Sequence, residues 1–208
     1  MSVHLLLNCP SMTKLTVRRP RRIREAGFNI IEMVFTLGIM AVITGVAVVQ
    51  INTTKPAMVG DSGMRVIIYY MNQAREMAIT QRRNMRVVFT APNQIDIKRE
   101  EVPGPTLTTI ASVVMEGKVI YQVTTGLPDT PDAFGNSSAT NFKVGSVDAT
   151  EIKFAPDGTL VNENGKLMNG SVFVAFPSQS LSSRAVTVMG STGRVRGYRW
   201  NGRAWKPV

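Results

Sequence analysis

The longest stretch of apolar positions lies close to the N-terminus of the chain. From Met33 to Ile51 no residue carries a charge. At a rise of about 1.5 Å per residue, a helix over these positions is about 28 Å long, close to the thickness of a bilayer's hydrocarbon core. The pattern predicts a membrane-spanning helix over residues 28–54. Because proline removes a backbone donor and glycine weakens a helix, Pro56 and Gly60 predict that this helix is kinked or interrupted near 52–60.

Beyond Gly60 the spacing of apolar residues changes twice. Asp61 or Ser62 can cap a second helical stretch, in which apolar residues recur every three or four positions: Met64, Ile67, Ile68, Met71, Ala74 and Ala78. After Asn84 apolar and polar residues alternate in short runs, as in half-buried strands. These runs are 85–90, 94–99, 118–123, 151–155, 159–161, 171–176, 184–189 and 193–200. Residues 124–150, rich in turn-forming types, predict a long surface connection.

This order of elements predicts an α+β fold in which an N-terminal hydrophobic helix packs on an antiparallel β-sheet domain. The chain has room for one globular domain besides the membrane helix. We expect that domain to cover residues 61–208 and to end in a basic hairpin tail, residues 184–208.

A turn signal stands inside that tail. Asn201-Gly202 favours a type I′ hairpin turn, because both residues readily take positive φ values. The expected register places Trp200 opposite Arg203. By strand alternation, one face of the hairpin then combines cations with aromatic rings: Arg194, Arg196, Tyr198, Trp200, Arg203 and Trp205.

Positive charge gathers at both ends of the sequence. Residues 1–27 hold six Lys/Arg and one acid, whereas residues 184–208 hold six cations and no acid. Basic residues beside a spanning helix stay on the cytoplasmic side. We therefore expect residues 61–208 to lie outside the cytoplasm, where the basic tail is the first part to meet a negatively charged partner.

Several kinds of chemistry are excluded by composition. The single histidine, His4, and the single cysteine, Cys9, both precede residue 28. The rest of the chain therefore has no thiolate or imidazole for a nucleophile, a zinc site or a disulfide. The acids of the 124–150 stretch match no calcium loop. We expect no enzyme activity, no metal and no cofactor.

An acid interrupts the start of the apolar run. Glu32 is the only charged residue between Phe28 and Ile51. A charge inside a membrane costs about 2.5 to 3.5 kcal/mol at mid-helix on insertion scales, and such residues usually have a partner. An ordinary secretory signal is shorter and carries no acid. The position of Glu32 within the apolar run therefore predicts that it has an intramembrane partner.

The residues Gly27-Phe28-Asn29-Ile30-Ile31-Glu32 resemble the processing site of type IV prepilins. This resemblance implies that a prepilin peptidase removes residues 1–27 after Gly27 and that the new N-terminus, Phe28, is methylated. It implies that Glu32 pairs with the Phe28 amine of a neighbouring pilin subunit during assembly. It also implies a bacterial inner-membrane protein that later enters a filament. The true start is Met1 or Met12.

Three further stretches indicate which group of pilins the chain resembles. Residues 74–79 (Ala-Arg-Glu-Met-Ala-Ile), 152–158 (Ile-Lys-Phe-Ala-Pro-Asp-Gly) and 193–196 (Gly-Arg-Val-Arg) are similar, in this order, to the GspH/FimT group. Members of that group are minor subunits, which implies a minor pilin that joins or initiates a type IV pilus. The alternative is a minor pseudopilin of a type II secretion system that contacts exported protein.

The tail adds DNA as a candidate partner. Gly193-Arg194-Val195-Arg196 resembles the motif by which FimT-type pilins hold DNA in natural transformation, which implies that Arg194 and Arg196 bind phosphate. Four neighbours extend this set, because guanidinium groups bind phosphate and rings stack on bases: Tyr198, Arg199, Trp200 and Arg203. The alternative is that the rings turn inward as core and that the cations protect an edge strand.

Overall fold

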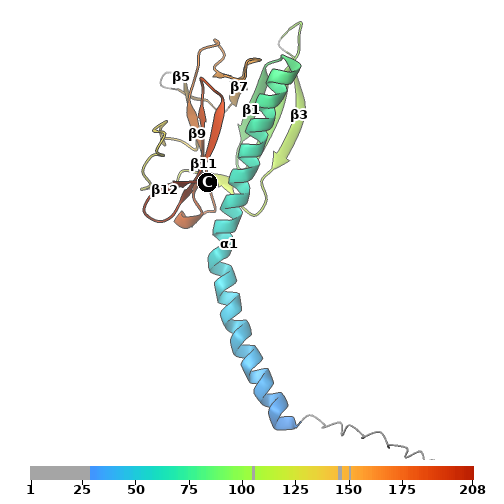
Figure 1. Cartoon of the computed structure of the whole chain (residues 1–208), viewed down its shortest axis with the longest axis vertical. Coiled ribbons are helices and arrows are strands. Elements are labelled where there is room, and N and C mark those ends of the chain that lie inside the picture. The colour runs from blue at the N-terminus through green and yellow to red at the C-terminus, as the bar shows by residue number, and fades with distance from the viewer. Residues whose placement is uncertain (1–28, 105, 145–146, 150) are drawn as a thin grey trace, which may run out of the picture. The chain divides into compact units, whose positions relative to one another are not determined.

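The computed structural model describes residues 29–104, 106–144, 147–149 and 151–208. In these ranges it contains one long α-helix, α1 (Ile30–Gln81), a short 3-10 helix, η1 (Ser180–Ser182), and twelve strands in two antiparallel sheets (Figure 1). The expected α+β fold is confirmed. The chain divides into two compact units, one ending at Gly45 and one covering Val46–Val208.

We expected a kink or an interruption near 52–60. Residues 52–60 are helical, so the interruption is absent. Pro56 lies inside the helix. A proline in a helix interior costs about 3 kcal/mol. Contacts with the rest of the domain oppose that cost, since Gly60 is buried and the carbonyl of Ala57 accepts a bond from the Arg184 guanidinium at 2.9 Å. Packing outweighs the local preference for a break.

The first sheet has the strand order β3-β2-β1-β7-β8. Its strands are β1 (Met85–Thr90), β2 (Gln94–Glu100), β3 (Leu107–Val114), β7 (Glu151–Phe154) and β8 (Leu160–Val161). The central strand β1 pairs with β2 on one side and with β7 on the other, placing Val87 opposite both Ile97 and Ile152. These three residues point into the core.

The second sheet has the order β12-β11-β10-β9-β5-β6, with β4 paired to β9. Its strands are β4 (Ile120–Tyr121), β5 (Thr140–Val144), β6 (Val147–Ala149), β9 (Gly170–Ala175), β10 (Arg184–Met189), β11 (Arg194–Trp200) and β12 (Trp205–Pro207). All six residues of β9 are buried. This central strand is therefore covered on both faces.

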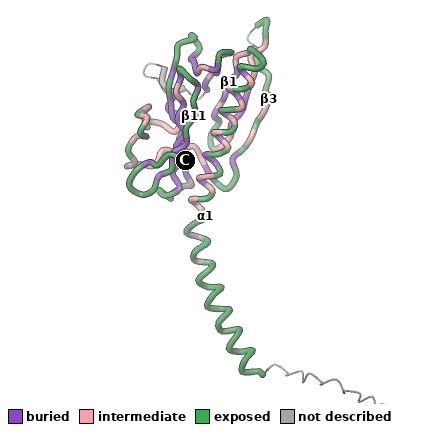
Figure 2. Tube along the Cα trace, in the orientation of Figure 1, coloured by how far each residue is buried: buried purple, intermediate pink, exposed green. Residues whose placement is uncertain are grey.

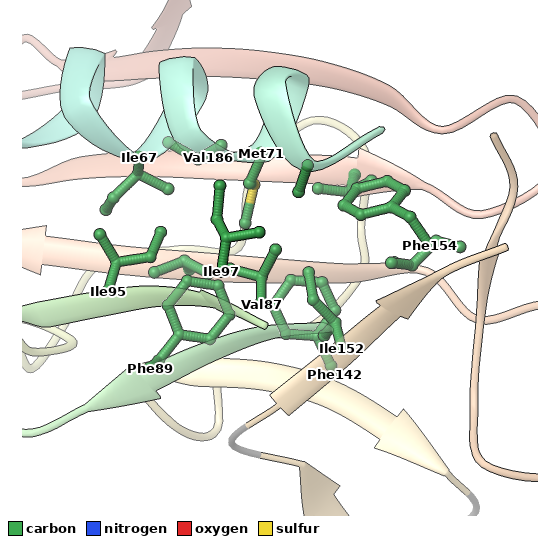
Figure 3. Packing of buried hydrophobic residues seen from close by; sticks show 14 of the residues in the cluster. Ile67, Met71, Val87, Phe89, Ile95, Ile97, Phe142, Ile152, Phe154 and Val186 are labelled. Carbon is green, nitrogen blue, oxygen red and sulfur yellow. The ribbon is translucent and has the colours of Figure 1, made fainter. Parts of the chain in front are cut away.

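The main core lies between α1 and the two sheets (Figures 2 and 3). The predicted face of the helix supplies its buried residues, except that Ile68 is half-buried. Figure 3 shows Ile67 and Met71 of α1 beside Val87 and Ile97 of the first sheet and Val186 of the second. The helix thus joins the two sheets into one domain.

Two parts of the sheet region differ from the prediction. Strand β3 was not expected, because most of its side chains are exposed and no alternating buried face marks it in the sequence. The stretch 124–150 contains β5 and β6, not only a surface connection. Asn141 and Phe142 of β5 are fully buried. Turn-forming residues around these short strands obscured them.

Candidate functional site: the apolar helix and the basic hairpin

The described part of the apolar helix begins at a capped end. Asn29 caps α1, since its side-chain oxygen accepts a bond from the backbone N–H of Ile31 at 3.3 Å. Glu32 lies in the first helical turn, where a carboxylate interacts favourably with the positive end of the helix dipole. Among the described residues, no ion pair of Glu32 is recorded. The other two predicted assembly residues, Gly27 and Phe28, lie outside the described residues.

The apolar run behind Glu32 has no cover within the chain. Residues Ile30–Val48 are long and apolar enough to cross a membrane, and none of this stretch is buried (Figure 2). Phe35 and Ile31 each expose at least 70% of their surface. Such a continuous exposed apolar surface requires lipid or other protein around it.

The C-terminal hairpin forms, but with a different turn from the one predicted. Trp200 pairs with Trp205 and not with Arg203, so the loop has four residues, 201–204. The side-chain oxygen of Asn201 accepts bonds from the backbone N–H groups of Arg203 and Ala204, both at 2.9 Å. This Asx-type turn replaces the two-residue turn because it lets the two indole rings pack edge to face, with centroids 5.5 Å apart.

The aromatic rings of the hairpin are turned inward. Tyr198, Trp200 and Trp205 are buried with Phe173 and Ala185 in a second hydrophobic cluster. The indole N–H of Trp205 donates to the carbonyl of Pro128 at 2.8 Å, as buried tryptophans commonly do. The structure therefore agrees with the alternative in which these rings are core, and it leaves no exposed ring face at Trp200 for base stacking.

Asp132 binds three side chains of the second sheet. Its carboxylate accepts bonds from the Thr187 hydroxyl at 2.6 Å, the Tyr198 hydroxyl at 2.9 Å and the Arg196 guanidinium at 3.0 Å. Burial alone would raise the pKa of Asp132, but these bonds and the charge of Arg196 outweigh it and lower that pKa below its usual value. For Tyr198, burial and the bond to Asp132 raise the pKa of the phenol. Arg196 is thus held by an acid while its side chain stays 43% exposed.

Asp61 on α1 binds two further cations of the tail. Arg184 donates to one carboxylate oxygen at 2.5 Å, and Arg199 donates to the other at 2.6 Å. The Arg184 side chain is only 1% exposed. Its remaining donors bind the carbonyls of Ala57, Leu181 and Ser183 at 2.8 to 2.9 Å. Because all three guanidinium nitrogens of this buried cation donate hydrogen bonds, Arg184 is structural.

The other tail cations are available to a ligand. Arg194, Arg203 and Lys206 are exposed, and none of them forms an ion pair with another described residue. Arg194 lies beside a groove of about 480 Å³ that Asn72, Arg75 and Thr192 also line. Arg75 Nε donates to the carbonyl of Gly158 at 3.1 Å, which fixes this side chain at the groove. Two arginines therefore line this groove.

The predicted tail set is split by the fold. Arg194, Arg196 and Tyr198 share one side of β11, whereas Arg199 turns to α1 and Arg203 lies in the hairpin loop. Sequence reasoning missed Asp132 and Asp61 as partners of these cations, because both acids lie more than 60 positions before them. It also missed Arg75, which no local motif marked. The described residues hold no group of His, Cys, Asp or Glu suited to a metal.

No model of a known protein family matches the sequence. No curated protein matches it either. Among solved structures, the chain is similar to the type IV minor pilin FimU of Pseudomonas aeruginosa (TM-score 0.44, 12% identity, 70% of this chain and 91% of that chain). It is also similar to the minor pseudopilin EpsH of the type 2 secretion system of Vibrio cholerae (TM-score 0.41, 10% identity, 65% of this chain and 93% of that chain). Both are distant similarities of fold and assign no function.

Proposed function

We propose that the protein is a minor pilin, a membrane-anchored subunit that joins or initiates a type IV pilus. The observation that carries this proposal is the wholly exposed apolar helix Ile30–Val48, with a single acid in its first turn directly behind Gly27-Phe28. The exposed helix supports anchoring in the inner membrane, and the prepilin-like residues before it support removal of residues 1–27 by a prepilin peptidase. The domain behind the helix is then displayed outside the cytoplasm.

Assembly follows from the electrostatics of Glu32. Cleavage after Gly27 frees an amine on Phe28, and methylation of that amine keeps its positive charge. Glu32 of an incoming subunit pairs with the amine of its neighbour, so each addition neutralises a charge that lipid disfavours. The same step covers the exposed apolar helix with the helices of other pilin subunits. In the filament, the charge of Glu32 is therefore paired and the apolar helix is covered.

The full chain, expressed in bacteria that carry a type IV pilus and its peptidase, tests this proposal. We expect the mass of the mature protein to match a chain that starts at methylated Phe28. We expect Glu32→Ala to be processed normally but to be recovered in sheared filaments at a level at least tenfold lower. Glu76→Ala is the matched control, because Glu76 is an exposed acid of the same helix within the domain.

Two results would contradict the minor-pilin assignment. One is an intact leader in cells whose peptidase processes other prepilins. The other is undiminished incorporation of the Glu32→Ala protein, which would mean that no charge pairing at this residue drives assembly.

DNA contact is a second candidate function, supported by the groove between Arg75 and Arg194. Guanidinium groups bind phosphate through paired hydrogen bonds. In this proposal Arg194 binds DNA phosphate directly, and Arg196 adds charge beside it. With the hairpin rings buried, the contact rests on phosphate alone and is independent of base sequence. The alternative, a minor pseudopilin that contacts exported protein, shares the anchor and lacks this contact.

The salt dependence of DNA binding distinguishes the DNA-contact proposal from the pseudopilin alternative. A phosphate site gives the full chain an affinity for duplex DNA at low salt that falls on a log-log plot with a slope of about 0.9 per contact. Arg194→Gln lowers that slope by about one contact, whereas Lys166→Gln, an exposed cation in a different loop, has a smaller effect. Unchanged binding after Arg194→Gln would eliminate the DNA proposal and leave the anchor proposal intact.

A further inference from the structure

Several segments of the second compact unit meet near Ala57 on α1. Arg184 ties them together, since it donates to the carbonyls of Ala57 on α1 and Leu181 on η1. The hairpin loop 201–204 lies against η1, where a Cβ added to Gly202 would be 3.5 Å from the Leu181 side chain. We call this the helix-entry end and define it by its exposed residues: Lys55, Met58, Leu181, Arg199, Arg203 and Lys206.

The helix-entry end carries an excess of positive charge. Arg199 and Lys206 face each other across β11 and β12, and Arg203 lies in the loop between them. Four of its exposed residues are cations, and the acid that contacts one of them is Asp61, which binds Arg199.

Asp61 is already occupied by two partners, since it holds Arg184 and Arg199. Lys55, Arg203 and Lys206 have no ion pair recorded within the described residues. These three ammonium and guanidinium groups can therefore bind an external anion.

Large apolar side chains stand exposed among these cations. Met58 is 69% exposed and Leu181, at the tip of η1, is 58% exposed. Cations mixed with exposed aliphatic side chains suit the boundary between lipid head groups and acyl chains. Duplex DNA offers no apolar layer to such side chains, and the two tryptophans of the hairpin are buried and cannot stack on bases. The mixture favours a membrane over a nucleic acid.

The chain keeps Lys55 close to the head groups. The apolar stretch that can span a bilayer ends at Val48, seven residues before Lys55. Seven helical residues extend about 10 Å, and the head-group layer on each side of a bilayer is about 5 to 8 Å thick. When the apolar stretch spans a bilayer, Lys55 therefore lies at most about 2 to 5 Å beyond this layer, close enough for its long side chain to reach lipid phosphates.

We propose that the helix-entry end binds anionic phospholipid at the membrane surface. Lys55, Arg203 and Lys206 contact head-group phosphates, and Leu181 enters the interface. This inference rests on the membrane anchoring proposed above. The contact holds the domain against the bilayer until the subunit leaves for the filament. Each basic residue near an anionic surface typically contributes about a fivefold gain in affinity.

The two tryptophans of the chain, Trp200 and Trp205, both lie in the hairpin and report on this contact. The full chain is reconstituted in nanodiscs of phosphatidylcholine, with or without about 30% phosphatidylglycerol, containing lipids with a nitroxide on the head group. If the helix-entry end binds anionic lipid, tryptophan fluorescence should be quenched at least twofold more strongly in the anionic discs. About 0.5 M salt should abolish the difference, because it shortens the screening length to about 4 Å.

A matched pair of triple variants locates the effect. Replacing Lys55, Arg203 and Lys206 by Gln should remove the lipid-dependent difference. Replacing Arg82, Arg83 and Lys166 by Gln removes the same charge outside the helix-entry end and should preserve it.

Three outcomes would overturn the inference. Equal quenching in both discs, or equal loss in both triple variants, would mean that no localised lipid contact exists. If quenching does not depend on the anionic lipid and duplex DNA binding depends on Lys55, Arg203 and Lys206, the surface binds nucleic acid instead. A chain that fails to enter the nanodisc would refute the anchoring proposal itself, and this inference with it.

Discussion

Two aspartates decide which cations of the C-terminal tail stay available to a ligand. Asp61 holds Arg184 and Arg199, and Asp132 holds Arg196. A count of charges in the sequence treats all six tail cations alike. The fold separates them into structural and free ones, because a buried cation must be paired whereas an exposed one need not be.

Arg184 and Arg199 share one carboxylate and differ in burial, so they form a matched test. Arg184→Met leaves three carbonyls without this donor and should destabilise the domain by about 3 to 5 kcal/mol, as expected when a buried ion pair is broken. Arg199→Met removes a side chain that is 45% exposed and should cost less than about 1 kcal/mol. Urea unfolding of the full chain in detergent, followed by tryptophan fluorescence, measures both.

Equal effects from the two substitutions would show that burial of Arg184 has no energetic consequence. In that case its bonds to Asp61 and to the three carbonyls would only replace bonds to water.

At the scale of elements, α1 approaches its neighbours closely at two glycines. A Cβ on Gly60 would lie 2.3 Å from the carbonyl oxygen of Ser182, and one on Gly63 would lie 2.8 Å from Val119. The close approach brings Asp61 within reach of Arg184. Gly60, which suggested a helix break in the sequence, is used for packing.

Gly60→Ala tests this close packing. The added methyl group meets backbone, which cannot rotate away, so we expect a loss of about 1 to 3 kcal/mol as in other overpacked sites. Ser62→Ala, two residues further on an exposed face of α1, should be neutral or slightly stabilising because alanine is the better helix former. Thermal unfolding of the two variants compares them directly. A Gly60→Ala protein as stable as Ser62→Ala would mean that the helix can move away from η1 without penalty.

Periodicity in the sequence predicted elements that have a regular buried side. Examples are the apolar stripe of α1 from Met64 to Ala78 and the alternation in β1. Strand β3 escaped prediction because its stabilisation comes from pairing with β2 and not from a buried face. The hairpin register was wrong because contact between Trp200 and Trp205 outweighed the local preference of Asn-Gly.

The candidate site was predicted in part for a similar reason. The apolar run and Glu32 are features of local sequence and could be read directly. The pairing of Arg196 with Asp132 and the closeness of Arg75 to Arg194 depend on strand order, which one sequence does not reveal. Contacts between residues far apart in the chain therefore needed the structure.

At the scale of the whole molecule, the apolar helix and the domain have separate sources of stability. Among the described residues, no buried one precedes Gly60. The core and its ion pairs lie within Val46–Val208, whereas the described residues up to Gly45 are exposed and mostly apolar. The second unit therefore has a core of its own, whereas no buried residue stabilises the described part of the first.

Two shortened chains test this separation. A chain that starts at residue 53 retains the contacts of Ala57, Gly60 and Asp61 with Ser182 and Arg184, so it should be soluble without detergent and unfold cooperatively.

A chain that starts at residue 63 loses all of these contacts and leaves Arg184 buried beside Arg199 without the aspartate. At about 2 to 4 °C per kcal/mol for a domain of this size, a loss of about 3 kcal/mol lowers its melting temperature by about 10 °C. Calorimetry of both chains gives the difference. Equal melting temperatures would mean that residues 53–62 belong to the anchor, and an insoluble longer chain would mean that the domain depends on the apolar helix to fold.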